Sequence, residues 1–263
     1  MSDTKLRLGC TCFGDSKASP VVFTPGWATD FNIFTPLQNL LDKCYIIIVD
    51  MPGYGKSKDL AIYADDINFC ASLLLNTIPK GCTLVSWSLS CLIGILACSK
   101  DQEHKISRFV TLCGTPRFPS DPMWPGFDYK YVLKTFSLFE RNEPQKSIRL
   151  FFMLQTQGNA LTQEQKNFLL SCYQKMGSIE LNVLKSGLFF MSHVDLRAAL
   201  ASLKIPCFHI FGQKDRLVKP ELVDKLDSLP NHKCVVFQNS AHTPFLTEPQ
   251  LFKQYLENFI NLS

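Results

Sequence analysis

The stretch Val85-Ser86-Trp87-Ser88-Leu89-Ser90 joins two apolar runs and decides how the chain folds. The run at 82–85 is apolar and partly β-branched, which predicts a buried strand, and the run at 89–99 predicts a buried helix. Ser88 stands between them with a small residue two positions away on each side, the pattern of a nucleophile elbow. Such a turn holds a serine hydroxyl at a helix N-terminus, where backbone N–H groups and the helix dipole stabilise negative charge.

Two residues depart from this pattern, because Ser86 and Ser90 stand where glycine is usual. Serine is small enough for a tight turn, but it lacks the freedom of glycine at strained backbone angles. On its own, the stretch is equally compatible with a serine that simply caps the helix after the strand. The interpretation therefore depends on the polar residues that follow later strands.

Strands and helices alternate over the first part of the 263-residue chain. Expected strands cover 6–13, 20–24, 44–50, 82–85 and 107–113, and expected helices cover 31–41, 63–77 and 89–99. This rhythm predicts an α/β fold with a mostly parallel central sheet and helices on both faces.

The rhythm breaks after residue 114, and no convincing strand follows until about residue 205. Helical stretches are expected at 129–139, 147–157, 162–176 and 179–190, which predicts an inserted helical cap. Strands then return at 205–212 and 233–237, with helices at 220–229 and 249–260. We therefore expect a first core segment at 1–114, a cap at 115–190 and a second core segment at 191–263.

Polar candidates follow the ends of the two late strands, where open α/β sheets place their sites. Asp215 follows the first and His242 the second, so the chain order is Ser88, Asp215, His242, which is the order of the α/β-hydrolases. A neutral imidazole can take the proton of a serine hydroxyl, and a carboxylate can fix the imidazole tautomer. The alternatives are a turn carboxylate at Asp215 and an ordinary loop histidine at His242. Asp195 is the rival acid.

An oxyanion hole needs two backbone donors. We expect the N–H of Leu89, next after Ser88, and the N–H of Trp27 in the loop after strand 20–24. Trp27 could instead be a packed core aromatic. Of the other histidines, His209 is expected in the core, His104 and His232 in solvated loops, and His193 is a weak candidate.

The rest of the sequence excludes several classes of protein. A net charge of +4 is too small to indicate nucleic-acid binding, and no apolar run approaches the ~18 residues of a membrane span. Gly55-Lys56-Ser57 lacks the earlier glycine of a phosphate-binding loop, and no Cys/His spacing indicates zinc. Eleven scattered cysteines and the lack of an apolar leader favour reduced thiols in the cytoplasm. We expect no metal, no cofactor, no membrane partner and a monomer.

The chain resembles the pimeloyl-[acyl-carrier protein] methyl ester esterases of biotin synthesis over nearly its whole length. The Ser88, Asp215 and His242 frame is shared with α/β-hydrolases in general. The same general family is indicated by Pro25-Gly26-Trp27 and Asp50-Met51-Pro52-Gly53-Tyr54-Gly55-Lys56-Ser57. The closer resemblance is carried by Met123-Trp124-Pro125-Gly126, Phe151 to Gly158 and Val194-Asp195-Leu196-Arg197, and Ser240 to Phe245 also fits it.

The resemblance implies a serine carboxylesterase that releases methanol from a pimeloyl methyl ester carried on acyl-carrier protein. It places the ester near Trp27, Ser88, Leu89 and His242. The acyl chain is implied to run beside the cap residues Phe151, Phe152, Met153, Leu154 and Gln155, whose apolar members suit a methylene chain.

Recognition of the acidic carrier is implied to use basic cap residues, and here the match is partial. Lys146 stands at one expected position with Arg149 close by, and residues 127–185 carry eight basic and five acidic side chains. A bias of this kind can steer an acidic partner, but it also fits an ordinary solvated face. The alternatives to the esterase are a broad small-ester or thioester hydrolase and a non-catalytic binder of acyl groups or carrier protein.

Overall fold

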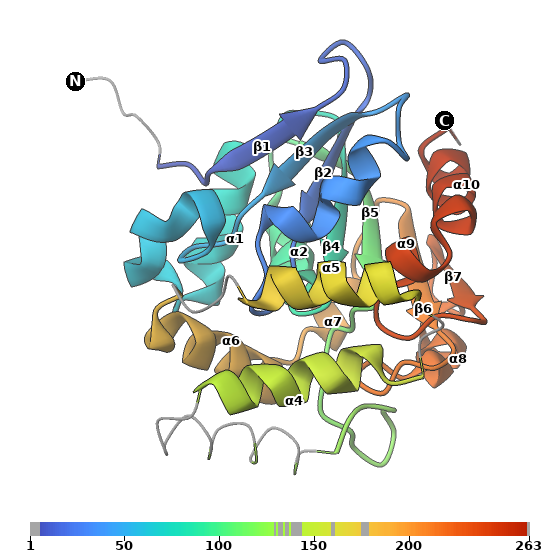
Figure 1. Ribbon diagram of the computed structural model, residues 1–263. Coiled ribbons are helices and arrows are strands. Elements are labelled where there is room, and N and C mark those ends of the chain that lie inside the picture. Colours follow the sequence, from blue (N-terminus) through green and yellow to red (C-terminus); the bar gives the residue numbers. More distant parts are fainter. Residues whose placement is uncertain are drawn as a thin grey trace.

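The computed structural model describes residues 6–128, 130, 134, 137, 144–158, 161–174 and 179–261. Seven strands form one sheet in the order β1-β3-β2-β4-β5-β6-β7 (Figure 1). Edge strand β1 runs antiparallel to β3, and the other neighbouring strands are parallel, which confirms the predicted α/β class. The strands are β1 Cys10–Phe13, β2 Pro20–Thr24, β3 Tyr45–Val49, β4 Cys82–Trp87, β5 Ile106–Leu112, β6 Cys207–Gly212 and β7 His232–Phe237.

Helices cover both faces of this sheet, and successive strand residues point to opposite faces. On β3, Ile47 joins the core under α1 and α2, whereas Ile46 and Ile48 join the core under η1 and α10. The helices, with η for 3₁₀, are η1 Phe31–Gln38, η2 Gly55–Tyr63, α1 Ile67–Thr77, α2 Ser90–Lys100, α4 Pro144–Thr156, α5 Gln163–Gln174, α6 Leu181–His193, α7 Arg197–Ala201, η4 Pro220–Leu222, α8 Val223–Leu226, α9 Pro244–Thr247 and α10 Pro249–Asn261.

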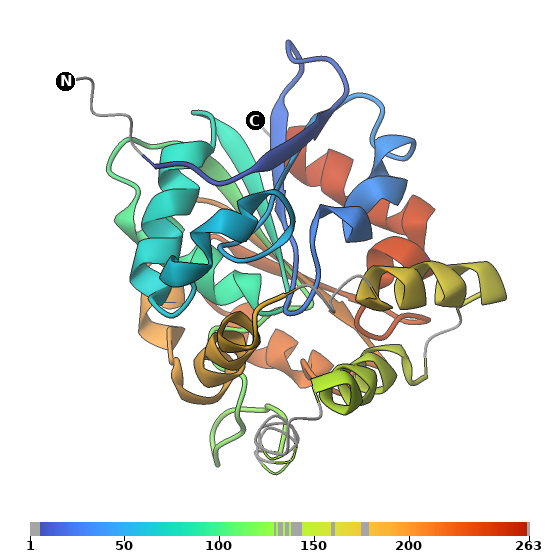
Figure 2. The same cartoon turned by 60° about the vertical axis from the view of Figure 1, so that its left-hand side comes forward.

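Helices α4, α5 and α6 lie between β5 and β6 in the chain, where the cap is expected. Both views show α4 and α6 below the strands (Figures 1 and 2). Most of the helix expected at 129–139 lies outside the described residues. Helix α6 continues past the expected boundary at 190 to His193, and the cap boundaries stay predictions. No helix within the described residues is long and apolar enough to span a bilayer.

Several local predictions need correction. The helix expected at 31–41 is a 3₁₀ helix that ends at Gln38 and contains Pro36, which has no N–H to donate. Residues 55–63 form the 3₁₀ helix η2, in a stretch for which the sequence predicts no helix before residue 63. The short helices α7 and α9 have no clear sequence signal, because four or five residues are too few to show a helical period.

The structure buries His209 as expected, but it also buries His232, which the sequence places in solvent. Nε2 of His209 lies 2.8 Å from Nδ1 of His232, and Nδ1 of His209 lies 2.7 Å from the hydroxyl of Thr111. Burial lowers the pKa of His209 from 6.5 to about 3 and also lowers the pKa of His232.

This histidine pair predicts a loss of stability in acid. The unfolded chain binds a proton near pH 6.5 that folded His209 does not bind until about pH 3. Neutral His209 therefore costs the fold nothing above pH 6.5. As the pH falls below 6.5, the free energy of unfolding decreases by up to about 1.4 kcal/mol per pH unit for each such proton. The free energy of unfolding, measured with urea at each pH from 7 to 4, should fall less steeply with decreasing pH in His209→Asn than in the unchanged protein. The control His104→Asn, at an exposed position, should show the same pH dependence of stability as the unchanged protein. If His209→Asn also shows that same pH dependence, buried His209 is not the cause of the acid sensitivity.

Candidate active site

Ser88 occupies the sharp turn between β4 and α2. Its φ of 57° lies in the left-handed region, which an L-residue with a side chain adopts at a cost in strain. The turn is anchored by the N–H of Ser88, which donates to the carbonyl of Leu112 on neighbouring β5. A strained serine between a parallel strand and a helix has the geometry of a nucleophile elbow.

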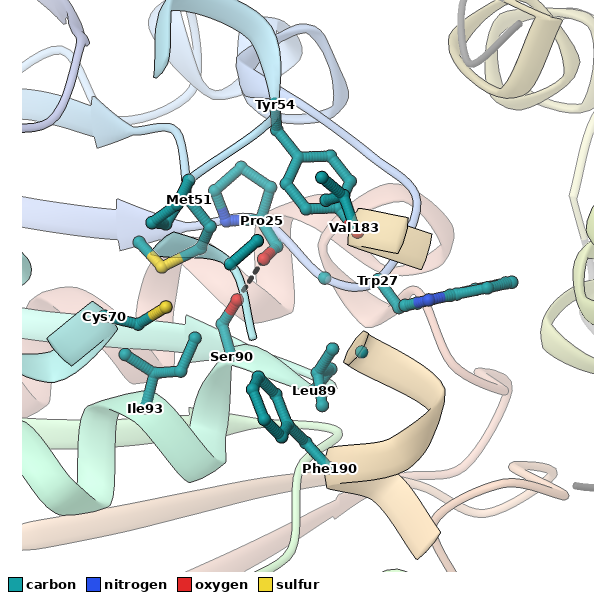
Figure 3. Close-up of a pocket in the computed structure, with 14 residues that line it drawn as sticks. Pro25, Trp27, Met51, Tyr54, Cys70, Leu89, Ser90, Ile93, Val183 and Phe190 are labelled. Carbon is teal, nitrogen blue, oxygen red and sulfur yellow. Dashed lines mark hydrogen bonds between the residues drawn. The ribbon is translucent and has the colours of Figure 1, made fainter. Parts of the chain in front are cut away.

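The two serines that replace the usual elbow glycines are both buried and hydrogen-bonded. The hydroxyl of Ser86 accepts from the hydroxyl of Thr24 at 2.9 Å. The Ser86 hydroxyl has room because Gly94 of α2 lies opposite it. A Cβ on Gly94 would be 2.5 Å from the Ser86 Oγ. The hydroxyl of Ser90 donates to the carbonyl of Pro25 in the loop after β2 (Figure 3). Both serines therefore tie the elbow to β2 and its loop.

The structure brings Ser88, Asp215 and His242 together although they are far apart in sequence. Nε2 of His242 lies 2.8 Å from the hydroxyl oxygen of Ser88, and Nδ1 lies 2.7 Å from Oδ2 of Asp215. The other carboxylate oxygen, Oδ1, accepts the N–H groups of Leu217 and Val218 at 2.8 and 3.1 Å. This arrangement is a buried hydroxyl–imidazole–carboxylate chain, in which backbone donors aim one carboxylate oxygen at the imidazole.

Two hydrogen bonds fix the backbone of His242 from either side. The indole N–H of Trp87, the residue before the elbow serine, donates to the His242 carbonyl at 2.9 Å. The His242 N–H donates to the Gln155 carbonyl on α4 at 3.4 Å. The backbone of His242 is thus held between β4 and α4.

The rival acid is not part of this chain. Asp195 is exposed between α6 and α7, where its carboxylate pairs with Arg197 at 2.7 Å and Arg117 at 3.3 Å. Hydrogen bonds from Arg197, helped by the positive charges of Arg197 and Arg117, lower the pKa of Asp195. His193 and His104 are likewise exposed. Asp195 is an ion-pair residue on the surface, and the sequence alone could not exclude it.

The loop after β2 lies directly against the elbow. A Cβ placed on Gly26 would be only 3.0 Å from the Ser88 Cβ, so glycine suits this close approach. Leu89 is the N-cap of α2, so the helix itself offers no carbonyl to the Leu89 N–H. The loop that carries Trp27 therefore lies against the elbow that carries Leu89, and the role of their N–H groups as an oxyanion hole stays a prediction.

Residues 19–249 match the family described as alpha/beta hydrolase fold. The chain belongs to the α/β-hydrolase family. Solved hydrolases confirm the fold: an esterase from Exiguobacterium antarcticum superimposes with a TM-score of 0.83 at 20% identity, over 96% of this chain and 95% of that one. A hydrolase from Oleispira antarctica superimposes with a TM-score of 0.82 at 18% identity, over 98% and 96% of the two chains.

Two relatives that are more similar in sequence than these solved structures share one name. The pimeloyl-[acyl-carrier protein] methyl ester esterase of Photobacterium profundum is 31% identical to this hydrolase and covers 94% of this chain and 96% of its own length. The esterase of that name from Serratia marcescens is 28% identical, over 91% and 93% of the two chains.

The cap of this hydrolase fixes Trp27. The indole N–H of Trp27 donates to the Leu184 carbonyl on α6 at 2.9 Å. Close approach is possible because α6 has Gly187 there, where a Cβ would come within 2.4 Å of the indole. From α4, the ring of Phe151 packs on Trp27 with 4.7 Å between ring centroids.

Helix α4 presents only part of the predicted acyl-binding set to the interior. Phe151 and Gln155, four residues apart, share the buried face, and Phe152 and Leu154 are half-buried beside it. Met153 is 56% exposed, so the structure does not place its side chain with the others. Lys146 and Arg149 are exposed on the same helix.

A mostly apolar pocket lies beside the loop after β2, between α2 and α6 (Figure 3). The loop after β3 and helix α1 also contribute to its lining. Leu89 and Ser90 from the elbow reach its edge. Its apolar lining includes Met51, Ile93, Val183 and Phe190.

Proposed function

We propose that this α/β-hydrolase is a serine carboxylesterase that converts pimeloyl-[acyl-carrier protein] methyl ester and water to pimeloyl-[acyl-carrier protein] and methanol. The observation that carries the proposal is the buried hydrogen-bonded chain from Ser88 through His242 to Asp215. The names of the relatives that match over nine-tenths of the chain support this substrate.

The geometry supports a two-step acyl transfer. Ser88 attacks the ester carbonyl while its proton passes to Nε2 of His242, and Asp215 stabilises the resulting imidazolium. The N–H groups of Trp27 and Leu89 hold the tetrahedral oxyanion. His242 then gives its proton to the methoxide leaving group, so methanol departs and an acyl-serine remains. Water, deprotonated by His242, attacks the acyl-serine; Ser88 regains a proton and the free carboxylic acid leaves.

The cap suits a long acyl chain on a carrier. Phe151 and the half-buried Phe152 and Leu154 offer an apolar surface above the elbow, which favours methylene groups. On the exposed side of the same helix, Lys146 and Arg149 can attract an acidic carrier protein. We propose acyl binding along the inner face of α4 and carrier docking on its outer face.

The substrate assignment is tested with purified pimeloyl-carrier methyl ester beside shorter and longer diacid homologues, with mass spectrometry following loss of the methyl group. We expect the pimeloyl ester to be hydrolysed with the highest kcat/KM, and the same methyl ester without its carrier to react more slowly. Equal rates for small free esters would favour a broad small-ester hydrolase. Carrier binding without turnover would favour a non-catalytic binder.

We propose a cytoplasmic location as well. All eleven cysteines lie in the described residues and none is in a disulfide. Reduced thiols in this number are typical of a reducing compartment.

Ser90→Ala is expected to slow hydrolysis although Ser90 is not in the proton relay. The variant removes the hydroxyl that holds the Pro25 carbonyl, and with it the anchor of the loop that presents the Trp27 N–H. We expect kcat to fall about tenfold with KM little changed, since misplaced transition-state contacts act on kcat. Ser90→Thr keeps a hydroxyl and should recover most of the rate. If Ser90→Thr is as slow as Ser90→Ala at equal thermal stability, the hydrogen bond is not the cause.

A further inference from the structure

Cys113 lies beside the proposed proton relay but has no part in it. It follows β5 with a φ of 45°, so its backbone is in the left-handed region that residues with side chains rarely adopt. Its N–H donates to the Ile210 carbonyl at 2.8 Å, and its buried thiol lies 3.7 Å from the Ala241 carbonyl. This backbone holds the sulfur at the loop that carries His242.

The thiol of Cys113, a carboxylate oxygen of Asp215 and a ring nitrogen of His242 lie within 4.8 Å of one another. Sulfur, oxygen and nitrogen donors of this kind bind Zn²⁺ tetrahedrally at about 2.0 to 2.3 Å, so two ligands of one ion are separated by roughly 3.3 to 3.8 Å. Small side-chain rotations would therefore bring all three onto one ion. Sequence spacing could not show this cluster, because its members follow three different strands.

We propose that Cys113, Asp215 and His242 form a binding site for a thiophilic divalent cation such as Zn²⁺, and that the bound cation inhibits the hydrolase. The cation would meet two negative charges, a thiolate and a carboxylate, which makes the buried cluster neutral. The N–H groups of Leu217 and Val218 already hold the second carboxylate oxygen of Asp215. In known metal sites, hydrogen bonds of this kind orient the ligating carboxylate.

Binding would stop catalysis by changing the tautomer of His242. Coordination at Nδ1 displaces the hydrogen bond to Asp215 and moves the imidazole proton to Nε2. That nitrogen then donates to Ser88 instead of accepting its proton, so the serine is no longer activated. The thiol of Cys113 loses its own proton to solvent. No oxidation or reduction is involved.

The resting thiol is expected to be neutral. Burial and the nearby Asp215 carboxylate raise the pKa of Cys113 well above its ordinary value. A cation must therefore replace the thiol proton, and it must reach three buried groups beneath the cap. Both requirements predict slow, reversible inhibition that a chelator relieves.

The inference rests on the proposed catalytic role of His242, so its test has one readout for metal binding and one for activity. The protein is preincubated with CdCl₂ or ZnCl₂, and hydrolysis is compared with the metal-free rate of the same variant. Cadmium–thiolate absorption in the ultraviolet gives the number of ions bound. We expect one ion per chain and strong inhibition of the unchanged protein. For both Cys113→Ala and Cys113→Ser, the cation concentration for half-inhibition should rise about tenfold or more.

The matched control is Cys12→Ser, which removes an exposed thiol on β1 and should leave both readouts unchanged. Inhibition that persists in both Cys113 variants, or that disappears in Cys12→Ser, would overturn the site. So would a folded protein that binds no cadmium. Cadmium binding that depends on Cys113 in a protein without esterase activity would uphold the site and contradict the proposed function instead.

Discussion

Ser88→Ala is expected to lower kcat for methyl ester hydrolysis by about 10⁵- to 10⁶-fold, because no other hydroxyl is held 2.8 Å from Nε2 of His242 in the part of the chain that the structure describes. The fully buried Ser88 side chain is small, and alanine removes one oxygen without creating a large cavity. The fold should therefore survive, and the loss should fall on kcat.

His242→Ala tests the same relay from its other end. Groups that act as one unit are not additive, so the double variant Ser88→Ala/His242→Ala should be about as slow as Ser88→Ala alone. Rates are measured by methanol release, with thermal unfolding as the check on folding. A double variant whose losses multiply would contradict a shared mechanism.

Asp215→Asn is the second large effect, with an expected loss of about 10⁴-fold in kcat at nearly constant KM. An amide in place of the carboxylate can face the imidazole with its NH₂ group, which favours the tautomer that cannot accept a proton from Ser88. The neutral amide also cannot stabilise the positive charge of the imidazolium. The N–H groups of Leu217 and Val218 donate to the position of Oδ1, so they favour the amide oxygen there. The NH₂ group is then left facing the imidazole.

Asp195→Asn is the matched control, because Asp195 is the one other acid that the sequence offered for this role. Its ion pairs with Arg117 and Arg197 are on the surface, where such pairs contribute little to stability. Its kcat should stay within about twofold of the unchanged protein. A loss at Asp195 as large as that at Asp215 would contradict the assignment of the acid.

The sequence predicts the sheet and the relay because both follow from parallel strands. Carboxyl ends of parallel strands meet at one edge of a sheet, so polar residues after β4, β6 and β7 must come close together. Ser88, Asp215 and His242 satisfy that rule from distant positions. The same reasoning cannot orient single side chains: Met153 lies in an apolar run but faces solvent, and His232 lies in a polar stretch but is buried.

Other features depend on contacts between distant segments that no local pattern encodes. Ser86 replaces an elbow glycine because Thr24 and Gly94 provide a partner and the space for it. Trp27 is fixed by a carbonyl on α6, more than a hundred positions away. Cys113 looks like one more buried cysteine until the fold places it beside Asp215.

The central claim is that Ser88 is activated by its neighbours for nucleophilic attack. The most direct measurement is labelling with a fluorophosphonate probe, followed by peptide mass spectrometry. We predict one adduct per chain, on Ser88, that forms far more slowly in His242→Ala and in Asp215→Asn. Labelling of a different serine, or labelling of Ser88 at an unchanged rate in His242→Ala, would contradict it.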